Sequence, residues 1–83
     1  MKKKAIIPYW KVNSFGFSYE FMGIMFYYNP SMGFCYMETN ENETTEVYFR
    51  NRLDLPNGVI FIEQDWEEES ETYLDYTFTF IPR

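Results

Sequence analysis

Apolar and polar residues alternate along most of the chain, and short turn sequences interrupt this alternation at intervals. Alternation with a period of two predicts β-strands, because successive side chains of a strand point to opposite faces. Residues such as Asn, Pro and Gly then mark the turns between strands. The pattern predicts six strands, over residues 4–12, 15–28, 34–38, 46–54, 59–67 and 73–81, with a break or bulge in the second at Gly23.

The dipeptide Asn57-Gly58 predicts a tight hairpin, because both residues readily take the left-handed conformation that a two-residue turn needs. A two-residue loop there sets the register of the flanking strands. On one face this register pairs apolar residues: Leu55 with Ile60, Leu53 with Ile62, and Phe49 with Trp66. On the other face it pairs polar and charged residues: Arg52 with Glu63, Arg50 with Asp65, and Tyr48 with Glu67.

A second hairpin is expected over residues 59–81, with a loop of three or five residues centred on Ser70. Such a loop puts Asp65 opposite Asp75. It also places one apolar row on the core face, made of Ile60, Ile62, Trp66, Leu74, Tyr76, Phe78 and Phe80. Asp65 and Glu68 also have the spacing of a helix capping box, so a short helix over 66–74 stays open as an alternative.

These elements predict an all-β chain, a small antiparallel six-stranded meander that forms a barrel or sandwich. The alternative is an α+β fold with one short helix near 66–74. The composition favours strands, since aromatic residues make up 23% of the chain while alanine occurs once and leucine three times. A chain of 83 residues forms a single domain, 1–83, with one modest core.

Charge is strongly biased toward carboxylates, with 13 Asp and Glu against 7 Lys and Arg and a net charge of −6. Seven of these carboxylates, and no cation, lie within residues 63–75. A protein with this charge is attracted to basic protein surfaces and repelled by nucleic acid and by anionic membranes. The candidate acidic surface consists of Glu67, Glu68, Glu69, Glu71 and Asp75, together with Glu46.

Five acids of this segment occupy alternate positions, so any extended part of it displays its carboxylates on one outer face. They are Glu63, Asp65, Glu67, Glu69 and Glu71. Alternate strand residues lie about 6.6 Å apart, close to the spacing of phosphates along a nucleic-acid strand. Such a row can imitate a phosphate backbone. The alternative is that the acids only keep an aromatic-rich protein soluble and protect its strand edges.

The segment from Phe21 to Met37 is apolar on both faces of its predicted hairpin, so both faces require cover. Only one face can meet the core of the later strands. The other face is a candidate surface for a partner, because Tyr, Phe and Met are enriched at protein interfaces. Its candidate residues are Met25, Tyr27, Met37 and Tyr48. The alternative is that the sheet folds over itself and covers this face.

The sequence excludes most catalytic chemistry. Histidine is absent, which removes Ser-His-Asp and Cys-His catalysis and the common zinc sites. No phosphate-binding loop or calcium-binding loop occurs. The single cysteine, Cys35, excludes an internal disulfide, and no segment has the apolar length of a membrane span. We expect a cytoplasmic protein that is not an enzyme and that needs neither a metal nor a cofactor.

These features favour a non-enzymatic inhibitor whose acidic surface occupies the basic nucleic-acid-binding site of a target protein, such as a defence nuclease. Small acidic phage proteins that block host defence, including anti-CRISPR proteins, share this character, which is an analogy and not a motif match. An immunity protein that neutralises a toxin would bind through the same kind of charge interactions, so this alternative stays open. A self-associating structural β protein, forming a homodimer through the apolar hairpin, is the other alternative. Direct nucleic-acid binding and membrane binding are not expected.

Overall fold

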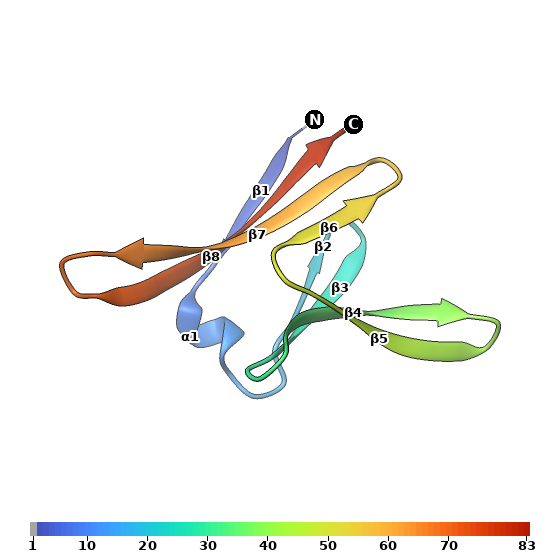
Figure 1. Cartoon of the computed structure of the whole chain (residues 1–83), viewed down its shortest axis with the longest axis horizontal. Helices are drawn as coiled ribbons and strands as arrows, with labels where there is room; N and C mark the ends of the chain where they lie inside the picture. Colours follow the sequence, from blue (N-terminus) through green and yellow to red (C-terminus); the bar gives the residue numbers. More distant parts are fainter. Residues whose placement is uncertain (1) are drawn as a thin grey trace.

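The computed structural model describes residues 2–83 and, of Tyr73, the backbone alone. The chain forms two four-stranded antiparallel sheets, with strand orders β1-β8-β7-β6 and β2-β3-β4-β5 (Figure 1). The elements are β1 (Lys3–Ile7), α1 (Tyr9–Val12), β2 (Ser18–Phe21), β3 (Ile24–Asn29), β4 (Gly33–Asn40), β5 (Glu43–Phe49), β6 (Arg52–Leu55), β7 (Gly58–Glu67) and β8 (Thr72–Pro82). The all-β prediction is confirmed, and of its two forms the sandwich fits.

Within residues 2–83 eight strands form where six were predicted, because two of the predicted strands divide. Residues 15–28 turn back at Met22-Gly23, where both residues have positive φ angles, 54° and 77°. They form the two-residue turn between β2 and β3, in which Phe21 pairs with Ile24. Residues 46–54 divide at Arg50-Asn51, where the chain leaves the second sheet and enters the first.

The predicted strand over residues 4–12 ends at Ile7. Pro8 follows, and the next four residues form the single turn of α1, in which the Val12 amide donates to the Pro8 carbonyl at 3.2 Å. Proline suits the start of a helical turn because it has no amide hydrogen to lose. Val12 is buried, so the turn helps to close one end of the core.

Aromatic rings join the two sheets. The ring of Phe78, at the centre of β8, is fully buried and meets four rings of the second sheet. Its centroid lies 5.5–5.7 Å from those of Tyr19, Phe21, Phe26 and Phe34, in each case edge to face. Edge-to-face contacts add to the free energy that burial itself provides. The abundance of aromatic residues in the sequence is therefore used mainly to hold the sheets together.

The β6–β7 hairpin lies at the predicted place but in a different register. Its loop is Pro56-Asn57, so Leu53 pairs with Ile60 and Arg52 with Phe61. All six predicted cross-strand pairs are therefore wrong: Leu55–Ile60, Leu53–Ile62, Phe49–Trp66, Arg52–Glu63, Arg50–Asp65 and Tyr48–Glu67. Between β6 and β7 the register differs by two residues, which leaves the side chains of these two strands on their predicted faces. Leu53, Ile60 and Ile62 are accordingly buried.

The β7–β8 hairpin is extended up to a turn over residues 68–71, so the alternative of a helix over 66–74 is wrong. Its ladder contains a β-bulge. Gln64 pairs with Tyr76 and Trp66 with Tyr73, so that Asp65 lies against two residues of β8, Leu74 and Asp75, and not in a direct pair with Asp75.

Trp66 and Leu74 are not core residues, contrary to the sequence prediction; their exposed fractions are 49% and 39%. The cause is that the hairpin extends beyond its neighbouring strands. β6 pairs with residues 58–61 of β7, and β1 pairs with residues 76–80 of β8. Beyond these partners the hairpin continues as a two-stranded ribbon. Tyr76, Phe78 and Phe80 lie where the neighbours are present, and they are buried as predicted.

The molecule is elongated, with extents of 49 × 31 × 17 Å. Its radius of gyration is 13.6 Å, against about 12 Å for a compact domain of this length. The β7–β8 and β4–β5 hairpins account for the length, because they extend to opposite ends of the long axis (Figure 1). No helix within residues 2–83 is long and apolar enough to cross a membrane.

Candidate functional site

The end of the β7–β8 hairpin carries a group of four exposed glutamates, called here the acidic tip: Glu67, Glu68, Glu69 and Glu71. Glu71 has a φ of 52°, and its amide donates to the Glu68 carbonyl at 3.3 Å. The hydroxyl groups of Ser70 and Thr72 lie 2.7 Å apart. The turn is thus held by its backbone and by its small polar residues, and the carboxylates are left to face solvent.

The outward face of β7 continues this charge toward the body of the protein. Glu63, Asp65 and Glu67 are exposed and occupy alternate positions of one extended strand, about 6.6 Å apart. Glu69 and Glu71 lie in the turn, so the row of five predicted from the sequence is a row of three. Asp75 is half-buried at the bulge, next to this row.

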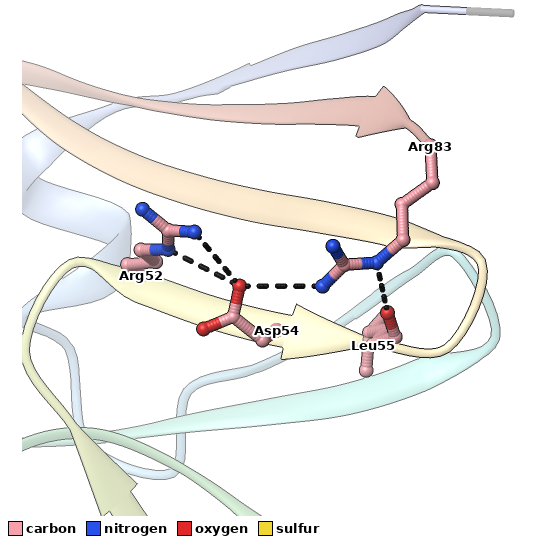
Figure 2. Close-up of polar contacts among 4 residues, drawn as sticks. All are labelled: Arg52, Asp54, Leu55 and Arg83. Carbon is pink, nitrogen blue, oxygen red and sulfur yellow. Dashed lines mark hydrogen bonds and ion pairs between the residues drawn. The ribbon is translucent and has the colours of Figure 1, made fainter.

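The ion pairs of the described chain all converge on another carboxylate, Asp54. Arg52 donates to Asp54 Oδ1 from Nε and Nη2, at 3.2 and 3.0 Å (Figure 2). Arg83 Nη2 lies 3.6 Å from the same oxygen, and Arg83 Nε donates to the Leu55 carbonyl at 3.0 Å. The guanidinium of Arg52 also lies over the ring of Phe61, 5.7 Å from its centroid.

The predicted cross-strand pairs would have set Arg52 beside Glu63 and Arg50 beside Asp65, and the structure shows neither contact. Asp54 is on the same strand as Arg52, two residues away, and takes the guanidinium in their place. Within residues 2–83, no carboxylate of the 63–75 segment has a Lys or Arg within ion-pair distance. Within the described residues, no ion pair therefore compensates the acidic tip or the row on β7.

Glu46 does not lie with the other predicted acidic residues. It is on β5, in the second sheet, and accepts a hydrogen bond from the Tyr48 hydroxyl at 2.6 Å. The other carboxylates of this hairpin are Glu38, Glu41 and Glu43, which lie around its end. Because the two hairpins point to opposite ends of the molecule (Figure 1), the predicted acidic surface is in fact two separate groups.

The four predicted apolar residues do lie together. Met25, Tyr27, Met37 and Tyr48 share the outward face of the second sheet, called here the tyrosine–methionine face. Tyr27 and Tyr48 lie directly across from Cys35, one on each side. Met25 and Met37 are 43% and 44% exposed and line a shallow hollow of about 350 Å³. The face is thus open to a partner.

Two groups on this face have altered pKa values. Burial, followed by the charge of Glu46, raises the pKa of the Cys35 thiol, which is only 4% exposed. The hydrogen bond to Glu46 is the main cause that raises the pKa of Tyr48 to about 12. Both groups are therefore neutral at physiological pH, and Cys35 has the environment of a small packing residue rather than of a nucleophile.

Three further exposed apolar residues were missed in the sequence analysis. Trp10, Phe15 and Met32 are 72%, 107% and 61% exposed. Trp10 and Phe15 had been assigned to strands, but they belong to α1 and to the loop that follows it. Pro8 and the turn residues Asn13-Ser14 were the sequence signals that could have shown that Trp10 and Phe15 lie outside strands. Of these three residues Phe15 lines an open hollow of about 410 Å³, which is formed by residues 12–16 and 28–30.

Within residues 2–83, no three Cys, Asp or Glu side chains are grouped closely enough to hold a metal ion. Comparisons with known proteins give no match: no family model fits the chain, and no curated protein or solved structure is significantly similar to it. Function must therefore be inferred from the surfaces described above.

Proposed function

We propose that this protein is a non-enzymatic inhibitor that occupies a basic, nucleic-acid-binding surface of a target protein. The observation that carries the proposal is the acidic tip: four exposed glutamates at the end of a projecting ribbon, with no cation within ion-pair distance in residues 2–83. A defence nuclease is an example of such a target, by analogy with the anti-CRISPR proteins that block host defence.

Shape and charge act together in this proposal. The ribbon extends past both of its neighbouring strands, so its end can enter a cleft that the body of the domain cannot. The row of Glu63, Asp65 and Glu67 follows with a spacing close to that of successive phosphates. Carboxylates that are already free of cations give up no internal ion pair when they meet lysines or arginines of the target.

The physics predicts how such binding responds to salt. Complementary charges speed association, and dissolved ions screen the attraction over a Debye length of about 8 Å at physiological ionic strength. Binding through the acidic tip should therefore weaken steeply as salt increases, and it should compete with the nucleic acid for which the target surface is built.

The test compares two matched triple variants. Glu68→Gln/Glu69→Gln/Glu71→Gln removes three charges from the acidic tip. Glu38→Gln/Glu41→Gln/Glu43→Gln removes three from the other hairpin, and each set includes one glutamate with positive φ. Each chain is immobilised and used to capture proteins from a lysate of the host, which are then eluted with a salt gradient.

We expect the wild type and the β4–β5 variant to retain the same nucleic-acid-binding protein, and the acidic-tip variant to release it at much lower salt. Equal retention by all three chains, or retention that salt does not affect, would refute the proposed role of the acidic tip.

A further inference from the structure

The residues of the tyrosine–methionine face lie in rows, set by the register of its four strands. One row across the sheet contains Ser18, Tyr27, Cys35 and Tyr48. The next row contains Glu20, Met25, Met37 and Glu46. An aromatic and apolar centre is thus bordered on each side by a carboxylate.

The tyrosine and the carboxylate at one border hold each other in place. The Tyr48 hydroxyl donates to Glu46 Oε2 at 2.6 Å, which fixes both side chains over the sheet. The other carboxylate oxygen of Glu46 is not used in this bond. The phenol is neutral at physiological pH, and the hydrogen bond to Glu46 raises its pKa further, to about 12. This border therefore offers an aromatic ring beside a carboxylate.

We infer that this face binds arginine side chains of the basic partner, with a guanidinium flat on the ring of Tyr27 or Tyr48 and hydrogen-bonded to Glu46 or Glu20. Guanidinium stacks on aromatic rings and is more weakly hydrated than the ammonium of lysine, so arginine fits this face better. The flexible methionine side chains can pack against the aliphatic stem. The inference rests on the proposed function only in taking the partner to be a basic protein.

Charge identifies a basic partner, and not a second copy, as the occupant. Residues 12–49 contain no Lys or Arg, so the second sheet has no cation of its own. A symmetric dimer brings the same patch of two chains together, and would place Glu20 and Glu46 against the same glutamates of the partner copy. Like charges facing each other across an interface oppose association.

The experiment titrates the full ¹⁵N-labelled chain with two peptides, one of alternating arginine and serine and one of alternating lysine and serine, of equal length and charge. We expect the arginine peptide to bind more tightly by about two- to fivefold per stacked side chain. The amide signals of β3, β4 and β5 should shift. Binding to the acidic tip alone would shift the amide signals of residues 67–72, and the two peptides would then bind with equal affinity.

Three variants complete the test. Tyr48→Thr and Glu46→Gln should each reduce the preference for arginine. Glu46→Gln does not change the core, so it still tests the inference if Tyr48→Thr folds poorly. The acidic-tip variant should weaken both peptides equally and keep the preference, so the two proposals can fail separately. Equal affinity for the two peptides would overturn the inference. So would dimerisation of the free chain that depends on Tyr48, seen by light scattering.

Discussion

The ring of Phe78 in β8 meets the ring of Phe26 in β3 edge to face across the two sheets, with the centroids 5.5 Å apart. Both rings are fully buried. This contact between strands far apart in the sequence holds the sheet with the acidic tip against the sheet with the tyrosine–methionine face. The two candidate surfaces therefore depend on one aromatic core.

Phe78→Ala should lower the free energy of unfolding by about 3–5 kcal/mol, because it removes the ring on which four others pack and leaves a cavity. Phe15→Ala is the matched control, since the Phe15 ring is fully exposed and its loss should change stability by about 0.5 kcal/mol or less. Urea denaturation measures both. Equal effects of the two changes would contradict the described core.

Gly58→Ala should cost about 1–3 kcal/mol through overpacking. A Cβ at Gly58 would lie 2.5 Å from the ring of Phe80 and 2.6 Å from the backbone carbonyl oxygen of Ile81, while the φ of Gly58 is not positive. The cost should therefore be smaller when measured in a Phe80→Leu background, where the ring is gone. A double-mutant cycle by denaturation measures the coupling. Strict additivity would show that the Ile81 carbonyl, and not the ring, requires glycine.

Gln64→Met should raise the free energy of unfolding by about 1 kcal/mol. The Gln64 Nε2 atom is buried, and within the described residues it has no hydrogen-bond partner. Methionine has a similar shape and removes the unsatisfied donor. Thermal unfolding followed by circular dichroism tests this. A lower melting temperature for Gln64→Met would mean that the amide is bonded in solution.

The free energy of unfolding should fall as the pH rises from about 10 to about 12, because the folded state holds the pKa of Tyr48 at about 12, above its ordinary value of 10.0. The raised pKa favours folding fully below pH 10, and the benefit is lost as the pH passes through the folded value. Ring-labelled tyrosine NMR can follow the titration of each phenol. In Glu46→Ala the Tyr48 phenol should titrate closer to pH 10; an unchanged value would exclude Glu46 as the cause.

The strand faces could be predicted from the alternation of apolar residues. Leu53, Ile60 and Ile62 are buried as expected, because a register error of two residues does not change the face. The loop itself was mispredicted. The observed loop begins with Pro56, whose φ near −65° suits the first position of a turn. Pro56 also has no amide hydrogen, which disfavours it as the paired strand residue beside an Asn57-Gly58 turn.

The candidate surfaces could be predicted only in part. Met25, Tyr27 and Met37 share one parity within the predicted hairpin, which is a local property of the sequence. Tyr48 joins them through the pairing of β5 with β4. Glu46 was grouped wrongly with the acidic tip because the crossing between sheets at Arg50-Asn51 is a tertiary feature with no turn signal of its own. The exposure of Trp66 was missed for a similar reason, since it depends on where the neighbouring strands end.

The most direct measurement of the proposed function is displacement of nucleic acid. The protein that the wild-type chain captures is loaded with a fluorescent oligonucleotide, and anisotropy is followed while the chain is added. We predict that the wild type and Glu38→Gln/Glu41→Gln/Glu43→Gln release the oligonucleotide, and that Glu68→Gln/Glu69→Gln/Glu71→Gln requires at least about tenfold more protein, a loss of about 1.4 kcal/mol. A complex in which the target keeps its oligonucleotide in the presence of the wild type would contradict the account.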